Sequence, residues 1–341
     1  MTIAFKRIQS KTRLLNPFKD FSLDEITFEI RHDPLTGETG RIYDLPYKAP
    51  EIHDLEETIQ RSREAFCPFC PASLEKSTPL FPREFIPEGR ITKGEATLIP
   101  NLVPFDTYAG VSIVSKEHYI PMAGLTAERM VAAFSAALEF IRRVIDFDSR
   151  VHYYYINWNY MPQSGSSLVH PHLQVNCGYV PTFVHRLQLE GLKKYCDEKG
   201  KNFWQDFMNA EKKLQERYIG EIGSTFWTMS FVPQSFLPDM WCIFKEHHSL
   251  VQAGLEEVNN FIQGLSRTLL YFDHNNIPAF NVSIFSTKED ANFRVNAKIC
   301  PRLLPRPIGN SDRAYLQVLH KESYTVRPPE AICPKVRKVF T

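Results

Sequence analysis

The chain has 341 residues, of which 43% are hydrophobic and 23% are charged, values typical of a soluble globular protein with one large or two ordinary domains. Its formal net charge of +1 argues against a polyanionic partner such as nucleic acid, and the absence of a run of about 18 apolar residues argues against a membrane span. Seven cysteines, an odd number spread through a long chain, favour reduced thiols and metal ligands in a cytoplasmic protein over a disulfide framework.

The N-terminal segment is predicted to be an arm, residues 1–28. Its first part is basic and contains no acid, and no apolar core of a secretory signal follows. We interpret it as a flexible or docking arm, with an organellar transit peptide as a minor alternative. A short strand-like run, residues 26–30, then leads into the turn Asp33-Pro34-Leu35-Thr36-Gly37.

Cys67 and Cys70 form a Cys-x-x-Cys pair. Such a pair chelates zinc or exchanges a disulfide. No second pair follows in the sequence. A zinc site here therefore needs two further ligands from histidines or carboxylates, and a redox role is the alternative.

The next segment reads as short strands, a helix and another strand. Beta-favouring runs lie between Gly94 and Lys116, and Thr126 is a candidate helix cap. A strand rich in tyrosine and tryptophan is expected over residues 151–159. The apolar residues at helical spacing after the cap are Met130, Phe134, Leu138, Ile141 and Ile145.

A Ser/Gly-rich loop and two histidines follow in the stretch from Ser164 to Gln174. In an extended strand, residues two apart share a face, so His170, His172 and Gln174 can converge on one small object. Gly165 allows the loop to bring N–H groups close to a phosphate. Neutral imidazole is a nucleophile, so this pattern indicates attack on phosphorus. Surface histidines or metal ligands alone are the alternative.

A second copy of this unit follows, displaced by 129 residues. The spacing and order of several identities are preserved together, which indicates an internal duplication. We expect two pseudo-symmetric α+β units that share one antiparallel sheet. The repeated residues are Gly94, Pro104, Lys116, Glu117 and His118, which recur as Gly223, Pro233, Lys245, Glu246 and His247.

The two copies differ at the histidines. The position of His170-Pro171-His172 falls near Asn296-Ala297-Lys298, where both histidines are absent. The first half therefore keeps the chemistry, and the degenerate second half supplies scaffold and substrate contacts. We divide the chain into the arm, a first half at 29–185, a helical connection with solvent-facing helix at 186–217, and a second half at 218–341.

This combination resembles the galactose-1-phosphate uridylyltransferase family of the histidine-triad superfamily. Its near relatives are nucleoside-diphosphate-sugar phosphorylases and diadenosine polyphosphate phosphorylases. The resemblance covers roughly residues 29–332. The segment Arg31–Gly37 looks like the family's early turn, and Arg327–Ala331 resembles its closing Thr-Pro-Glu-x-Ala segment. It implies an α+β fold of two histidine-triad-like units, with an antiparallel sheet flanked by helices.

The resemblance also implies the roles of individual residues. His172 would be the nucleophile that forms a nucleotidyl-histidine, and Gln174 would donate a hydrogen bond to a phosphoryl oxygen. Residues implied to contact substrate are Asn159, Ser167, Ser166 and Arg31. A structural zinc ion would be held by Cys67, Cys70, His118 and His170.

The chain departs from the family at some positions. Leu173 stands where the uridylyltransferases usually have glycine. Asn296-Ala297-Lys298 replaces a His-x-His that binds a second metal in some members, so we predict no iron site. We expect Lys298 to be an ordinary surface lysine, with a role in holding the acceptor as the alternative. The family's late hexose-binding glutamine is not identifiable around residues 321–324.

We therefore predict a nucleotidyltransferase that moves UMP or AMP by a ping-pong mechanism from a nucleotide-activated donor to a phosphate-bearing acceptor. The alternatives are a phosphorylase of an adenylylated substrate that uses inorganic phosphate, and a non-catalytic nucleotide-binding protein. We expect small-molecule partners, no nucleic acid, no membrane and a homodimer as one possible state. The sequence does not identify the base, the donor or the acceptor.

Overall fold

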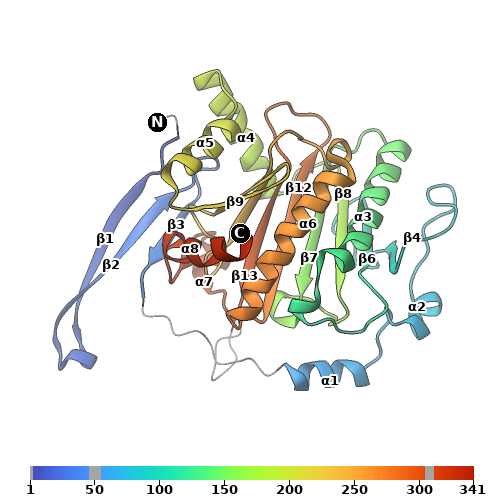
Figure 1. The fold of residues 1–341 in the computed structure, drawn as a ribbon, viewed down its shortest axis with the longest axis horizontal. Helices are drawn as coiled ribbons and strands as arrows, with labels where there is room; N and C mark the ends of the chain where they lie inside the picture. Colours follow the sequence, from blue (N-terminus) through green and yellow to red (C-terminus); the bar gives the residue numbers. More distant parts are fainter. Residues whose placement is uncertain (1–2, 46–54, 304–310) are drawn as a thin grey trace.

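The computed structural model describes residues 3–45, 55–303 and 311–341. Across these residues, none of the helices has both the length and the apolar character that crossing a membrane requires. Two β-sheets organise the fold (Figure 1). The large sheet has ten strands, and the small sheet has four.

The large sheet takes five strands from each half of the chain. The first five are β4 (Ile91–Lys93), β5 (Ala96–Pro100), β6 (Tyr108–Ile113), β7 (Tyr153–Tyr160) and β8 (His172–Gly178). The second five are β9 (Tyr218–Ile222), β10 (Thr225–Met229), β11 (Met240–Phe244), β12 (Ala279–Thr287) and β13 (Asn296–Arg302).

The order of these strands reveals the duplication. It is β4-β5-β6-β8-β7-β12-β13-β11-β10-β9, and every pairing is antiparallel. Counted outward from the central pair β7–β12, the two sides present their strands in the same succession. The prediction of one continuous antiparallel sheet built from a repeated α+β unit is therefore confirmed. The division of the chain at residues 29, 186 and 218 stays a prediction.

Two long helices cover one face of this sheet, α3 (Ala127–Phe147) and α6 (Leu250–His274), and they pack against each other. Thr126 is the N-cap residue of α3, as predicted. The expected apolar positions of α3 lie in the main core, although Ile145 is only partly buried. The strand residues on this face are Leu173, Val175, Phe280, Val282, Ala297 and Ile299, among others.

The helical connection is partly buried, which corrects our expectation of a solvent-facing helix. It forms α4 (Phe183–Lys199) and α5 (Phe203–Leu214). One side of α5 packs against Trp241 and Phe285 in a second core on the other face of the sheet. Its apolar residues recur at helical spacing along one side, a stripe that an expectation based on the charge of the wider segment overlooks. That stripe consists of Phe203, Trp204, Phe207 and Met208.

The arm, predicted to be flexible or docking, is a regular hairpin that projects from the body (Figure 1), and its docking role stays a prediction. Strands β1 (Arg7–Asn16) and β2 (Ser22–His32) pair along their whole length, so β2 runs through residue 28, where we placed the end of the arm. Basic residues of this segment face acids across the turn and the strands, which explains the regular structure. The ion pairs are Lys11–Glu25, Arg13–Glu25 and Lys19–Asp24.

The hairpin belongs to the small sheet, whose order is β1-β2-β3-β14. It adds β3 (Thr39–Tyr43) and β14 (Ser323–Thr325), which pair in parallel. The remaining helices are α1 (Glu56–Glu64), α2 (Pro71–Ser77), α7 (Tyr315–Leu319) and α8 (Pro329–Phe340).

A buried ion cluster fastens the small sheet to α8. Arg31 of β2 makes a bidentate pair with Glu330 of α8, with N···O distances of 2.8 and 2.9 Å. Arg217 adds a third bond to Glu330 at 2.8 Å, and both guanidinium groups lie over the ring of Phe231. Burial by itself would raise the pKa of Glu330, but the two arginines outweigh burial and lower it to about 2.

Replacing Glu330 with Gln should destabilise the fold, because Arg31 and Arg217 would lose the carboxylate that they share, although Arg31 keeps Glu29 and Arg217 keeps Glu211. We expect a loss of about 1.5–3 kcal/mol in the free energy of unfolding at pH 7, measured in urea. The folded pKa lies below the ordinary value of 4.5. The carboxylate's contribution is therefore complete above that value and is lost as the pH falls towards 2, so wild type and variant should converge in acid.

The control is Glu139→Gln, which removes a partly exposed partner of Arg143 within α3. It should change the free energy of unfolding by about 0.5 kcal/mol or less. Equal effects of the two substitutions would contradict the role of the cluster.

Candidate active site

Four predicted metal ligands lie together in the first half. Cys67 and Cys70 come just before α2, His118 lies in the loop after β6, and His170 lies just before β8. Their ligand atoms are all within 4.8 Å of one another. The sulfur of Cys70 is 3.2 Å from Nδ1 of His118, and that of Cys67 is 3.6 Å from Nδ1 of His170.

A polar contact at Nε2 orients the ring of each histidine. Nε2 of His170 lies 2.9 Å from the carbonyl oxygen of Ser115, and Nε2 of His118 lies 2.8 Å from the hydroxyl of Ser62. Each ring therefore directs Nδ1 at the cysteines, as histidines that bind a metal do. Burial lowers the pKa of His170 to about 4, so its ring is neutral. A closed set of two cysteines and two histidines fits a structural zinc ion.

His172 does not join this cluster, although it lies two residues from His170. Its Nδ1 lies 2.8 Å from the carbonyl oxygen of His170, which requires Nδ1 to carry the proton and donate it. Nε2 is then left with a free lone pair. The ring is 6% exposed and stands edge-on to Phe69, and burial lowers the pKa of His172. The result is a neutral imidazole with one available nucleophilic nitrogen.

The structure separates the three side chains that we expected to converge. His172 and Gln174 share a face of β8, because the intervening Leu173 points into the core under α3. His170 turns to the metal cluster instead, since β8 begins only at residue 172.

The Ser/Gly-rich loop before β8 contains Gly165 in the left-handed region, with φ of 92°. The hydroxyl of Ser166 is committed to the loop, because it donates to the carbonyl oxygen of Leu168 at 2.6 Å. Ser167 is exposed. Of the two predicted serines, Ser167 is therefore the one whose hydroxyl faces outward.

Asn159 of β7 lies beside His172 on the same face. Trp158 pairs with Leu173, so the next residue of β7 and the preceding residue of β8 are also neighbours. The side-chain oxygen of Asn159 accepts a hydrogen bond of 2.6 Å from Asn281 of β12. Its Nδ2 group is then the end that can donate to a ligand.

The sequence analysis missed Asn281 and the residues that hold it. Its Nδ2 group also donates to the carbonyl oxygen of Ser164, at 2.9 Å, and its oxygen accepts from Arg302 at 2.8 Å. Arg302 is fixed in turn by a bidentate pair with Asp312. The available signal was the alternation in β12 of apolar Phe280 and Val282 with polar Asn281 and Ser283, which places the polar pair on the face opposite the helices. The second half therefore orients groups of the first half.

Arg31 is not brought to this site. Its guanidinium is fully engaged in the ion cluster of the small sheet, and its role as a substrate contact stays a prediction. The side chain of Asn296 forms a reciprocal amide pair with Gln188 and accepts from the indole of Trp241.

Lys298 is not the ordinary surface lysine that we expected. It is half-buried, and its ammonium group lies 5.0 Å from the ring centre of Trp241. Burial opposes its charge, but Asp239 and other carboxylates raise the pKa of Lys298. It lies on the face of the sheet that carries His172, because its neighbours Ala297 and Ile299 point into the core.

The chain was compared with known proteins by sequence and by structure. No family model matches the chain. An uncharacterised protein from Archaeoglobus fulgidus is 32% identical over 323 residues, which cover 94% of each chain.

Two solved structures share the fold. An ADP-glucose phosphorylase from Arabidopsis thaliana, solved with bound ADP-glucose, gives a TM-score of 0.71 at 18% identity. A uridylyltransferase gives 0.66, also at 18% identity. Each comparison covers 91% of this chain and 98% of the other. The resemblance found in the sequence is therefore confirmed at the level of the fold.

The metal site predicts that the purified protein contains about one zinc ion per chain. Cys70→Ser should lose most of this metal and unfold at a lower temperature, because the ion links α2 to the loops before β8. Elemental analysis and thermal unfolding with and without a chelator measure both effects.

The matched control is Cys196→Ser, which alters a partly exposed cysteine of α4 outside the cluster. It should keep the metal and respond to the chelator as the wild type does. A wild-type protein that is free of metal and indifferent to chelator would refute the site.

Proposed function

Since the chain belongs to one family with the Archaeoglobus fulgidus protein and has the fold of the uridylyltransferase and the ADP-glucose phosphorylase, we propose that it is a nucleotidyltransferase acting through a covalent nucleotidyl-histidine at His172. The observation that carries this proposal is the hydrogen bond from Nδ1 of His172 to the carbonyl oxygen of His170. It fixes the tautomer in which Nε2 is the nucleophile.

In the first step, the lone pair of Nε2 attacks the α-phosphorus of a nucleotide-activated donor. The bond from phosphorus to the bridging oxygen breaks, and the leaving group departs with that electron pair as a phosphate. In the second step, a phosphate oxygen of the acceptor attacks the same phosphorus, and the P–N bond returns its electrons to His172. The two steps give ping-pong kinetics.

The groups around His172 are donors for the phosphoryl oxygens. Asn159 offers its Nδ2 group, because its oxygen is occupied by Asn281. Gln174 lies two residues along the same face of β8 and offers its side-chain amide. Ser167 adds an exposed hydroxyl at the loop. Donors fixed in advance stabilise charge as it shifts during transfer.

The zinc ion would be held by Cys67, Cys70, His118 and His170, and when bound it supplies a structural cross-link rather than chemistry at phosphorus. Fixing His170 also fixes the carbonyl group that orients His172.

The donor is a nucleotide-activated small molecule that delivers AMP or UMP. ADP-glucose is the first candidate, because the plant relative was solved with it bound. UDP-glucose, diadenosine polyphosphate and adenylyl sulfate complete the set. The acceptor is inorganic phosphate or a phosphorylated small molecule, and inorganic phosphate would make the enzyme a phosphorylase. The protein works in the cytoplasm without nucleic acid or membrane partners, and a homodimer is its proposed assembly.

Incubation with the four donors separately should increase the intact mass of the protein by one nucleotide monophosphate. The size of the mass increase identifies the nucleotide as UMP or AMP. His172→Ala should show no adduct, since no other nitrogen occupies its position. His152→Ala, an exposed histidine just before β7, is the matched control and should retain the adduct.

No adduct in the wild type, combined with stable nucleotide binding, would instead favour a non-catalytic binding protein.

Asn159→Asp tests the donor role, because the carboxylate can still accept from Asn281 but has no N–H for phosphate. Its rate of adduct formation should fall by about 10²–10³, in line with the loss of one fixed donor. Rapid-quench measurement of the first step gives this rate. An unchanged rate in a variant that unfolds at the wild-type temperature would contradict the role.

A further inference from the structure

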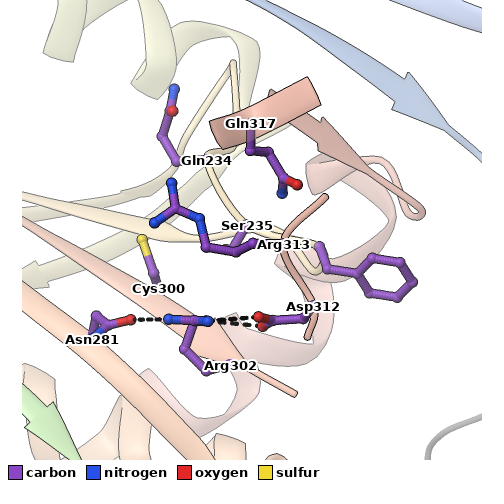
Figure 2. A pocket seen from close by; sticks show the side chains of 9 residues that line it. Gln234, Ser235, Asn281, Cys300, Arg302, Asp312, Arg313 and Gln317 are labelled. Carbon is purple, nitrogen blue, oxygen red and sulfur yellow. Dashed lines mark hydrogen bonds and ion pairs between the residues drawn. The ribbon is translucent and has the colours of Figure 1, made fainter. Parts of the chain in front are cut away.

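A cavity of about 150 Å³ opens on the face of the sheet that carries His172 (Figure 2). Its floor is formed by Asn281 of β12 and by Cys300 and Arg302 of β13. Its walls come from the loop after β10, with Gln234, and from the segment around α7, with Arg313 and Gln317. We propose that this cavity binds an anionic group at the far end of the acceptor molecule, an inference that rests on the proposed function.

The first observation is a buried amide without a partner. Gln317 is 5% exposed, and its oxygen accepts a hydrogen bond of 2.7 Å from the backbone N–H of Ala314. Its Nε2 group is buried and has no hydrogen-bond partner among the residues that the structure describes. Buried polar groups are almost always paired, so an orphaned donor at a cavity wall indicates that a ligand accepts its hydrogen bond.

The second observation is the balance of charge. The charge of Arg302 is cancelled by the bidentate pair with Asp312. Arg313 also lines the cavity, and Figure 2 shows its guanidinium group pointing back across it. Within the described part of the chain this guanidinium has no carboxylate partner. The cavity therefore carries a net positive charge and a free amide donor, which match a phosphate, sulfate or carboxylate group.

The size of the cavity limits the ligand. A cavity of about 150 Å³ accommodates an anionic group with a few attached atoms.

The cavity lies at a fixed distance from His172 across the sheet. Asn281 pairs with Asn159 across the β7–β12 seam, and Asn159 is the neighbour of His172. With about 4.8 Å between adjacent strands, the wall at Asn281 lies about 10 Å from His172 and β13 about 14 Å away. This separation is too long for the phosphate that reacts. It suits a second anionic group of the same molecule.

The test compares two probes on the metal-containing wild-type protein without a nucleotide donor, so that no turnover occurs. Glucose 1-phosphate carries one phosphate, whereas glucose 1,6-bisphosphate carries a second one at the opposite end of the sugar. Calorimetry should give at least tenfold tighter binding of the bisphosphate. Arg313→Gln should remove most of this preference, because the cavity then loses its uncompensated charge.

Gln317→Glu provides a second variant that preserves the local structure. Its carboxylate can still accept the hydrogen bond from Ala314, but it replaces the donor with a negative charge. The preference for the bisphosphate should disappear. Arg83→Gln, an exposed arginine in the loop between α2 and β4, is the matched control and should retain the full preference.

Equal affinities of the wild type for the two probes, or a preference that survives both variants, would overturn the proposal. This outcome is separable from failure of the proposed function, because binding of the probes needs no covalent step and adduct formation needs no acceptor. An adduct without a bisphosphate preference would refute the anionic subsite alone. A preference without an adduct would refute the covalent mechanism.

Discussion

The pairing of β7 with β12 is the constraint on which the site depends. Eight successive residue pairs, from Tyr153–Thr287 to Tyr160–Phe280, join the two copies into one sheet. Because strand residues alternate between faces, this register brings Asn159 and Asn281 to the same side at the same level. A slip of one residue would turn Asn281 into the helical core and leave Asn159 without its partner. The geometry around His172 in the first half therefore relies on a copy that lacks both histidines.

His170 and His172 have different surroundings, and the carbonyl group of His170 connects them. His170 gives its ring to the metal cluster and its carbonyl oxygen to Nδ1 of His172. A metal ligand and a nucleophile two residues apart would compete for the same ion if both rings faced it. The chain prevents this competition by starting β8 at His172, so that the ring of His172 belongs to the sheet and that of His170 to the preceding loop.

Local patterns predicted much of this structure. The Cys-x-x-Cys pair and the helical periodicity after Thr126 depend on residues close in sequence. The duplication shows in a spacing that recurs 129 residues later, and the fold confirms it. The burial of α5 was missed because the many charges of the wider segment favoured a solvent-facing helix, although the apolar residues of α5 have helical spacing. The hairpin was missed because its basic residues are neutralised only once β2 is paired. Asn281 and Arg302 lie more than a hundred residues after Asn159. No local pattern indicates that they meet, because strand order decides it.

The ion cluster between Arg31 and Glu330 has a consequence for biosynthesis. The two residues are 299 positions apart. At about 5–20 residues per second, roughly 15–60 s of translation separate their emergence from the ribosome. During that interval Arg31 has no carboxylate from α8, so the small sheet cannot dock in its final form. In the nascent chain the N-terminal hairpin is synthesised before α8, so the small sheet reaches its final docked position only after α8 has been made.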